Sequence, residues 1–593
     1  MVMEVNEKHD GDLVRLKCSV KEYDWGRIGL DSLVARLFLR NCNDKIEESK
    51  HYAEFWMGTH ASGPSFIAEE KGVGNVSLKS WISKNPEVLG DTVVDKWGID
   101  LPFMFKVLSV AQALSIQAHP DKELAGLLHT LKSNVYKDAN HKPEMVLALT
   151  EFEALCGFIS FEELETVLES VPEIMEVVGG AYADEVLPVN EEAKEAQFLR
   201  SIFIKLMSAG SKVVSVAVSK LINRLDKENK VPKYMSLALL MLCLDHISSR
   251  EDGKDDEGLD VFLQLQEESM RRSTAGGVTG LKERIDEAAP RFLVQVFVSR
   301  FRVLSLRLLV GPPSSPSLWQ PIGNMVVIGY PTSVLGDIAP DDNSFFSSNQ
   351  TRQLTSKEEL ALKLEKQYPD DIGVIASFLF NHVRLNPGEA LYVASNEIHA
   401  YVGGECVECM ATSDNVVRAG LTPKNRDVKI LCSMLTYKQG PPEILKGVPV
   451  NAYTKRYNPP FEEFEVDRCM LDQGASVVFP AVPGPSIFLV LSGQGSMYTS
   501  VSSPSPSSPS SSLFSSPSSS TTSSSLSSPS SSLSSPFSSL SLSSPSLSPY
   551  EDTVHGGDVL FVPANTEVHV STESELHLYR AGVNHMLFSK TSM

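Results

Sequence analysis

Two stretches of this chain share one pattern: GEALYVASNEIH (residues 388–399) and GDVLFVPANTEVH (residues 557–569). Each has a turn glycine followed by an acidic residue, an apolar strand, an asparagine-bearing turn and a second strand that ends in histidine. Glycine and asparagine favour turns, and short apolar runs between turns favour strands. The pattern therefore predicts two β-units of the same kind, the second of which has one extra residue.

The pattern resembles the second sequence motif of cupins, which are small jelly-roll β-barrels. Two copies predict two cupin-type barrels in a mainly β chain, a catalytic barrel and a second, carboxy-terminal barrel. An α-helical insertion interrupts the β-rich sequence. It begins with SFEELETVLESVPEIMEVV, which has apolar residues at helical spacing and a capping-box pattern formed by Ser160 and Glu163. Helical spacing continues to about residue 245.

Changes of composition and periodicity along the chain predict its division into parts. Residues 354–369 form a further predicted helix, with Thr355 at its start. The predicted parts are a first part of the catalytic cupin domain at 1–158, a helical domain at 159–245, an irregular insert of loops or disorder at 246–350, a second part of the catalytic cupin domain at 351–440 and a carboxy-terminal cupin-like barrel at 441–593.

Residues 500–549 are almost entirely serine, proline and leucine. Such a tract buries too little apolar surface to offset its chain entropy, so we expect it to be disordered. It separates two strand-like segments, SIFLVLSGQGSMY and TVHGGDVLFVPANTEVHV. Because the cost of closing a loop grows only logarithmically with its length, a hairpin can carry such an insert. We interpret the tract as an expanded loop within the carboxy-terminal barrel.

The composition limits the classes of function. The 593 residues carry a formal net charge of −21, which repels a phosphate backbone and argues against a nucleic-acid partner. An anionic substrate would therefore need a locally basic site. Eight cysteines without dense spacing do not form a disulfide framework. Since neither a secretory apolar region nor an apolar stretch of about 20 residues is visible, we expect a cytoplasmic monomer with no membrane partner.

Four residues are candidate metal ligands. In LSIQAHPDK, Gln117 and His119 are two apart on a predicted strand, so they point to the same face. The segment HKPEM supplies Glu144, and the first cupin-like stretch supplies His399. Two imidazoles and a carboxylate suit zinc, with an amide oxygen as an unusual fourth ligand. Each residue alone has a plainer interpretation as a hydrogen-bonded structural residue, and it is the conjunction that favours a metal.

Several longer segments resemble the signature segments of the type I phosphomannose isomerases. They are SIQAHPDK, HKPEM, ECVECMATSDNVVRAGLTPKNRDV, YDWGRIG, YAEFWMGTHASGPS, VPGPSIFLVLSGQG and GGDVLFVPANTEVH. The similarity covers most of residues 13–240 and 350–593, with the segments in the family's order. It implies a cupin catalytic domain, an inserted helical domain and a second cupin-like barrel. It also implies a zinc-dependent aldose–ketose isomerase that interconverts mannose 6-phosphate and fructose 6-phosphate and supplies mannose for GDP-mannose synthesis.

The resemblance also implies roles for individual residues. One zinc ion per chain would be bound by Gln117, His119, Glu144 and His399. Arg418, in NVVRAG, would be a catalytic residue. The residues that would line the substrate site are Lys106, Ser115, Lys142, Tyr401 and Lys424. With Arg426 nearby, these cations would supply the basic site that an acidic protein needs in order to bind a sugar phosphate.

The implied reaction moves a proton between C2 and C1 of the sugar through an enediolate. Zinc would act as a Lewis acid on the enediolate oxygens, and Arg418 would add fixed positive charge. A base must take the C2 proton, and both an amine and a carboxylate can serve. Lys142 and Glu408 are the two candidates, and the sequence does not choose between them.

Two further patterns could suggest other chemistry. Cys406-Val-Glu-Cys409 is a CxxC, but a single CxxC without a partner pair is weak support for a redox or zinc site. His569 lies in a predicted barrel that has no counterpart of the Gln-x-His or HKPE segments, so we expect it to be structural.

Two other functions are compatible with parts of the sequence. The chain could be a catalytically inactive sugar-phosphate-binding protein, but the complete ligand set argues against this. It could instead be another metal-dependent cupin enzyme, such as an iron oxygenase. Oxygenases favour histidine-rich ligand sets with open positions, and the glutamine with surrounding lysines fits a sugar phosphate better.

Overall fold

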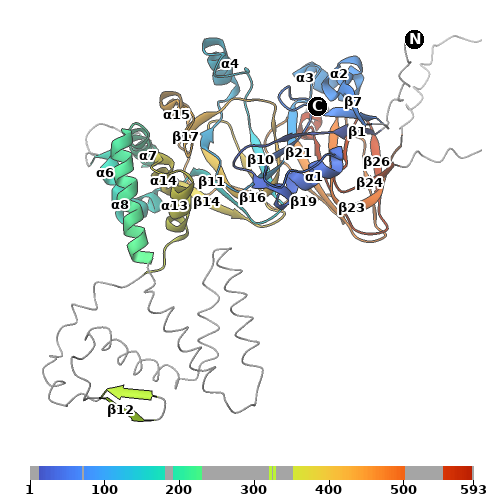
Figure 1. Ribbon diagram of the computed structural model, residues 1–593. Helices are drawn as coiled ribbons and strands as arrows, with labels where there is room; N and C mark the ends of the chain where they lie inside the picture. Colours follow the sequence, from blue (N-terminus) through green and yellow to red (C-terminus); the bar gives the residue numbers. More distant parts are fainter. Residues whose placement is uncertain are drawn as a thin grey trace, which may run out of the picture. The chain divides into compact units, whose positions relative to one another are not determined.

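Two large antiparallel sheets contain most of the strands that the structure describes (Figure 1). The structure is a computed structural model that describes residues 13–69, 72–179, 191–229, 319–322, 325–328, 352–500 and 552–589. The chain divides into two units, one of Met1–Asp226 with Leu354–Met593 and the other of Lys227–Gln353. Both sheets belong to the first unit.

The two predicted irregular segments fall largely outside the described residues. Within the insert predicted at 246–350, the structure describes one antiparallel pair, β12 (Trp319–Ile322) with β13 (Met325–Ile328). Of the serine-rich tract at 500–549, it describes only Ser500, the last residue of a strand. The helical prediction for 230–245 also lies outside the described residues.

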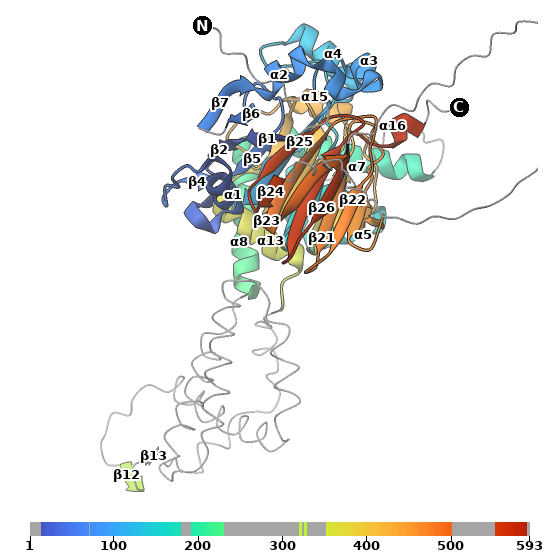
Figure 2. The same cartoon turned by 90° about the vertical axis from the view of Figure 1, so that its right-hand side faces the viewer.

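The twelve-stranded sheet is built mainly from carboxy-terminal strands, several of which are in front in Figure 2. An amino-terminal strand, β1, lies between β25 and β6, with Val14 opposite Phe561 and Leu16 opposite Ile67. The first strand of the chain therefore joins the carboxy-terminal strands to β6 and β7. The strands are β1 (Val14–Lys17), β6 (Phe66–Glu69), β7 (Gly72–Ser77), β19 (Val448–Pro449), β20 (Thr454–Tyr457), β21 (Glu465–Leu471), β22 (Ser476–Phe479), β23 (Ser486–Ser500), β24 (Asp552–His555), β25 (Val559–Val562), β26 (Glu567–Ser571) and β27 (Leu576–Gly582).

The eleven-stranded sheet carries the candidate site. Its central strand is β16, which pairs with β8 and β10 in one half and with β9 and β11 in the other. The strands are β2 (Ser19–Lys21), β5 (Glu54–Met57), β8 (Phe103–Val110), β9 (Ile116–Ala118), β10 (Glu144–Ala148), β11 (Phe152–Phe158), β14 (Phe380–Leu385), β15 (Ala390–Val393), β16 (His399–Ala411), β17 (Val417–Gly420) and β18 (Ile444–Leu445).

The two cupin-like stretches form the same local structure. The first supplies β15 and the start of β16, and the second supplies β25 and β26. Their turn glycines, Gly388 and Gly557, have φ angles of 88° and 103°, and the turn asparagines Asn396 and Asn565 have 63° and 60°. Positive φ favours glycine and is tolerated by asparagine, which explains why these residues stand at these turns. The predicted turn–strand–turn–strand pattern is confirmed in both copies.

Helices begin at the two predicted starts. Ser160 caps α5 (Phe161–Ser170) by accepting a hydrogen bond from the backbone N–H of Glu163. The Glu163 side chain pairs instead with Lys357 of α13 (Ser356–Gln367), at 2.8 Å. Thr355 starts α13 with a complete capping box. The remaining helices of the helical part are α6 (Pro172–Val178), α7 (Glu191–Met207), α8 (Ser211–Asn229), α14 (Ile372–Ala376) and α15 (Val428–Met434).

Three of the apolar clusters position the eleven-stranded sheet. One cluster contains side chains from both sheets, including Phe55 and Val107 from one and Phe561 from the other, so the sheets share a core. A second lies within the eleven-stranded sheet and includes Leu391. The third joins the helices to one end of that sheet, for example through Phe203 of α7. Burial of apolar surface in such clusters is the main favourable contribution to the free energy of folding.

The predicted fold class, mainly β with several helices, is confirmed, whereas the two closed jelly-roll barrels stay a prediction. Among the described residues, no single helix combines the length and apolarity needed to cross a membrane. One sharply bent pair, Lys194–Met207 with Ser211–Asn229, meets that test on length and composition alone.

Candidate metal centre

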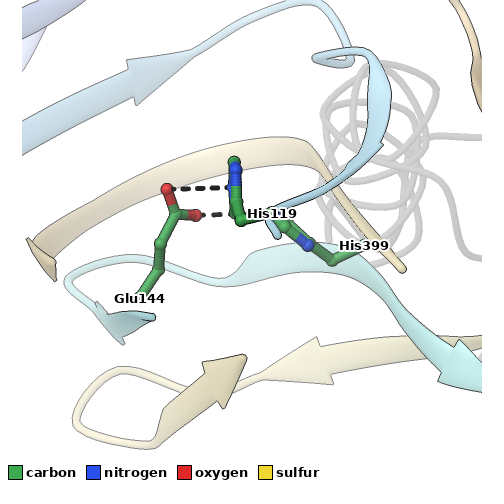
Figure 3. Close-up of side chains that lie close together, drawn as sticks. All are labelled: His119, Glu144 and His399. Carbon is green, nitrogen blue, oxygen red and sulfur yellow. Dashed lines mark ion pairs between the residues drawn. The ribbon is translucent and has the colours of Figure 1, made fainter. Parts of the chain in front are cut away.

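Three of the predicted ligands meet inside the eleven-stranded sheet (Figure 3). The carboxylate of Glu144 lies between two imidazoles: its Oε1 is 3.3 Å from Nε2 of His119, and its Oε2 is 3.3 Å from Nε2 of His399. The two rings are 5.0 Å apart. All three side chains are almost completely buried. Their ligand atoms lie within 4.8 Å of one another, close enough to bind a single metal ion.

Strand pairing brings the fourth predicted ligand to the same place. Gln117 of β9 is buried and lies directly opposite His399 of β16. On the other side of β9, Arg418 of β17 lies directly opposite Gln117. Directly opposite residues of antiparallel strands point to the same face of a sheet. The structure therefore brings Gln117, Arg418 and His399 to one face.

A bulge in β16 lets two halves of this strand contribute to one site. His399 and Glu408 are nine residues apart, an odd number that would place them on opposite faces of a regular strand. The pairing register of β16 with β11 shifts between Tyr401 and Gly403, so an extra residue is inserted there. Tyr401 and Cys406 accordingly share one apolar cluster although they are five residues apart.

Hydrogen bonds fix the orientation of the ligands. The Nδ1 of His119 donates to the backbone carbonyl of Asn415 at 2.7 Å, which leaves its Nε2 with a free lone pair. The hydroxyl group of Tyr401 donates to Oε2 of Glu144 at 3.1 Å. The Asn415 amide in turn donates to the backbone carbonyls of Asp138 and Asn140. Such partners are typical of metal ligands, whose orientation and basicity they set.

The electrostatics of the three side chains fit a cation. Burial, reinforced by Lys142, lowers the pKa of His119 to about 4, so its imidazole is neutral. Burial opposes the ionisation of Glu144, but Lys142, His119 and His399 outweigh it and hold the pKa of Glu144 well below its ordinary value. The buried Nε2 atoms of His119 and His399 have no hydrogen-bond partner among the described residues. Two lone pairs that face a carboxylate are the arrangement a divalent cation satisfies.

Two lysines and two more carboxylates surround this group. Lys142 binds Oε1 of Glu144 at 2.8 Å. Lys106 of β8 lies directly opposite Glu408 of β16. Its ammonium group is 2.8 Å from the carboxylate of Glu408 and 3.5 Å from that of Glu54. Burial lowers the pKa of Lys106, but both carboxylates raise it well above its ordinary value. Burial also raises the pKa of Glu408, with Lys106 opposing and Glu144 adding to the rise.

The remaining predicted residues are more exposed. Ser115 is half-buried and directly precedes β9. Arg418 is half-buried, and burial lowers the pKa of its guanidinium. Its side chain makes no hydrogen bond or ion pair with any residue that the structure describes. Lys424 is exposed, and Arg426 donates to the carbonyl of Ala419. Tyr401 differs from these because it is 1% exposed and bonded to a ligand.

The two cysteines of the CxxC segment do not share a site. Cys406 belongs to the cluster inside the eleven-stranded sheet, and Cys409 belongs to the core between the two sheets. Burial raises the pKa of both thiols well above the ordinary value. His569 stacks on Tyr498 at 4.7 Å and lies 3.0 Å from the carboxylate of Glu567. Within the described residues, His119, Glu144 and His399 form the one His/Cys/Asp/Glu group that could hold a metal.

Sequence reasoning did not single out four residues next to the site. These residues all contact a predicted site residue or its support: Trp56, His60, Asp138 and Asn415. Trp56 and His60 lie within the family-like segment YAEFWMGTHASGPS, and the family resemblance was the only signal for them. Asn415 lies in the family-like segment ECVECMATSDNVVRAGLTPKNRDV, but its bond to His119 is made by the backbone carbonyl, which carries no residue-type signal.

Comparisons with known proteins show which family this chain resembles. A family model described as phosphomannose isomerase type I, catalytic domain, matches residues 13–161. Mannose-6-phosphate isomerase 1 of Arabidopsis thaliana is 42% identical over 574 residues, which are 96% of this chain and 94% of that protein. Mannose-6-phosphate isomerase of Saccharomyces cerevisiae is 33% identical over 496 residues, which are 82% of this chain and 89% of the yeast protein.

Solved structures show a similar fold. A mutant phosphomannose isomerase from Salmonella typhimurium aligns with a TM-score of 0.59 at 20% identity, covering 96% of this chain and 99% of that one. A mannose 6-phosphate isomerase bound with zinc and yttrium aligns with a TM-score of 0.58, also at 20% identity and with the same coverage. These identities support the fold alone, whereas the curated relatives are similar enough in sequence and length to define the family. This chain belongs to the type I phosphomannose isomerase family.

Proposed function

We propose that this protein is a zinc-dependent isomerase that interconverts mannose 6-phosphate and fructose 6-phosphate. The observation that carries the proposal is the pair of buried Nε2 atoms, of His119 and His399, that face the Glu144 carboxylate without hydrogen-bond partners among the described residues. With Gln117 opposite His399, they match the ligand set that the family resemblance implies. The curated relatives are named for this isomerase activity, and one structural neighbour binds zinc.

The side chains around the centre are suited to the reaction. Zinc held by His119, Glu144, His399 and Gln117 would supply a Lewis acid for the oxygens of the substrate. Arg418, on the same face as Gln117, would stabilise the negative charge that develops on those oxygens. Lys106, held by two carboxylates, would keep its positive charge for an anionic substrate.

Two residues are candidates for the base that moves the proton between C2 and C1. Lys142 lies 2.8 Å from Glu144, and its amine must lose a proton before it can accept one. Glu408 is buried on the same face, and a raised pKa brings a carboxylate closer to the range of an efficient base. Lys142→Met and Glu408→Gln variants separate the two when each retains its zinc, because loss of the true base then abolishes exchange of the C2 proton with solvent.

Several finer statements belong to the same proposal. We propose one zinc ion per chain, cupin-type barrels for both sheets, and substrate-lining roles for Ser115, Tyr401 and Lys424. The division of the chain at residues 158, 245, 350 and 440 is likewise a proposal, as are a cytoplasmic location, a monomeric state and a role in supplying mannose for GDP-mannose synthesis.

One assay tests the function. Purified protein should convert mannose 6-phosphate to fructose 6-phosphate, lose activity with a chelator and regain it when zinc is added back. His119→Ala and His399→Ala should each lose both bound zinc and turnover, since each removes one ligand from a small set. Binding of the sugar phosphate without turnover would identify an inactive binding protein, and activity restored by iron alone would identify a different metal enzyme.

A further inference from the structure

A second group of polar residues lies beside the metal centre. Asp414 belongs to the turn between β16 and β17, next to Asn415, whose carbonyl holds His119. One carboxylate oxygen of Asp414, Oδ1, lies 3.4 Å from Nε2 of His60. The Asp414 side chain is 42% exposed, and no described residue donates a hydrogen bond to its second oxygen. One oxygen is therefore held, and the other is open to a ligand.

The hydrogen bonds of His60 assign its tautomer. Its Nδ1 accepts a hydrogen bond from the backbone N–H of Ser62 at 3.2 Å, so Nδ1 carries no proton when the ring is neutral. The proton is then on Nε2, the atom that faces Asp414. The His60 side chain is only 11% exposed, and its ring packs edge-on against Trp56 at 5.2 Å. His60 is thus held in place with its Nε2 3.4 Å from one carboxylate oxygen of Asp414.

The main chain of Asp414 is held independently of His60. Its backbone N–H donates to Oδ2 of Asp138 at 2.8 Å, and the neighbouring Ser413 hydroxyl donates to Oδ1 of Asp138. Loss of His60 would therefore free the Asp414 side chain and leave the turn in place. This separates a positioning role for His60 from a role in folding.

The same group extends to a predicted substrate residue. The ring of Trp56 lies 5.0 Å from the ammonium group of Lys106, and Trp56 donates its indole N–H to Glu54, which also pairs with Lys106. Asp414 is near enough to Lys106 and Lys142 that both help His60 to lower the pKa of its carboxyl. An ionised carboxylate with one open oxygen, set among cations that suit a phosphate ester, is suited to accept a hydroxyl hydrogen bond.

We propose that His60 is a positioning residue that holds the Asp414 carboxylate so that its second oxygen accepts a hydrogen bond from a hydroxyl group of the sugar phosphate. The proposal rests on the proposed function for the identity of the ligand. It deepens that function by assigning recognition of the sugar hydroxyls to a pair of residues outside the metal ligands.

The probe is mannitol 6-phosphate, which carries the hydroxyls and the phosphate but has no carbonyl group to isomerise. Calorimetric titration should show that His60→Leu, which keeps an apolar contact with Trp56, weakens binding of this probe by about tenfold, the value expected for one hydrogen bond to a charged group. His60→Gln retains an N–H donor and should recover part of the loss. Affinity for inorganic phosphate, which has no sugar hydroxyls, should stay unchanged.

A double-variant cycle completes the test. If His60 acts through Asp414, His60→Leu should add nothing to Asp414→Asn, and the double variant should bind the probe as Asp414→Asn does. Zinc content and melting temperature should match those of a control, His577→Leu, in β27 of the other sheet. Additive losses, an equal loss for inorganic phosphate, or lost zinc would each overturn the proposal. Turnover by the wild-type protein is measured separately, so failure of the isomerase function is distinguished from failure of the His60 role.

Discussion

The hydroxyl group of Tyr401 donates a hydrogen bond to Oε2 of Glu144 at 3.1 Å, and its ring lies against His399, 5.8 Å between centroids. Tyr401 is 1% exposed, so this bond is formed away from water. The residue that the family resemblance assigns to the substrate site therefore also contacts a candidate metal ligand.

Tyr401→Phe should lower zinc affinity by about 10- to 100-fold, the usual cost of removing a group that orients a metal ligand. The ring stays, so packing against Phe152 should be kept. Competition with a zinc chelator measures the change. Tyr392→Phe is the matched control, because the hydroxyl group of Tyr392 on β15 donates to Glu443 and not to a candidate metal ligand. Normal zinc affinity with a raised KM would instead assign Tyr401 to the substrate alone.

The bulge in β16 can be tested at one glycine. Gly404 has a φ of 109°, and an added Cβ would lie 2.4 Å from the carbonyl oxygen of Glu151. Gly404→Ala should therefore lower the free energy of unfolding by about 2–4 kcal/mol and reduce zinc binding, because the bulge aligns His399 with Glu144. Gly403→Ala is the control, since its added Cβ meets only the end of the Lys363 side chain, at 3.5 Å. Equal stability of the two variants in urea denaturation would contradict this account.

Local features of the fold could be predicted from the sequence, because the residues that determine them are adjacent. The turns at Gly388 and Asn396 recur at Gly557 and Asn565 since both residue types accept positive φ. The helix start at Thr355 follows from a side chain three residues from its partner. The ligand set was predictable as residue types, and the family resemblance was needed to group it.

Long-range features could not be predicted in the same way. Nothing local to Val14 indicates that it pairs with Phe561 at the other end of the chain. The face on which a strand residue lies follows from alternation, and an unforeseen bulge reverses the alternation for everything beyond it. This is why His399 and Glu408 share a face despite their odd separation. The contact of His60 with Asp414 joins two loops and has no spacing signal.

An ion-pair group on β11 and β14 should make stability depend on pH. The pKa of Glu153 is lowered to about 2, first by His382 and then by Lys363, while burial acts in the opposite direction. The pKa of an unfolded glutamate is about 4.3. A lowered folded-state pKa stabilises the protein above pH 4.3, and this contribution is lost as the pH falls toward 2. After allowance for partial exposure, it amounts to about 1–2 kcal/mol.

Glu153→Gln should therefore be less stable than the wild type by a constant amount above pH 5, and the difference should shrink as the pH falls from 4.5 to 3. Denaturant unfolding at several pH values measures it. Glu165→Gln, an exposed residue of α5, is the control and should differ little from the wild type at any pH. A difference that stays constant down to pH 3 would show that Glu153 contributes through packing rather than charge.

The segment between β23 and β24 should be dispensable for catalysis. The two strands pair antiparallel, with Met497 opposite Asp552, so both ends of the segment leave from neighbouring positions in one sheet. Replacement of residues 501–549 by a short glycine-containing turn should preserve turnover and zinc content, and a shorter loop should raise stability slightly. A folded but inactive variant would show that the segment has a role in the reaction.

Arg418 should act on the reaction more than on the fold or the metal. It could have been a surface residue paired with Asp414, but Asp414 pairs with His60, and Arg418 has no ion pair with any described residue. An exposed pair would in any case contribute only about 0–1 kcal/mol. A fixed cation beside developing enediolate charge should matter far more, so Arg418→Ala should lower turnover by about 100-fold or more.

Arg418→Lys keeps the charge but loses the planar, forked guanidinium, so it should recover only part of the activity. Zinc content, melting temperature and turnover are measured together for both variants. Since Arg418 is directly opposite Gln117, a loss of zinc in Arg418→Ala would mean that it supports a metal ligand instead. Turnover close to that of the wild type would remove it from the catalytic residues. The expected result is full zinc, an unchanged melting temperature and a kcat that falls in both variants, more in Arg418→Ala than in Arg418→Lys.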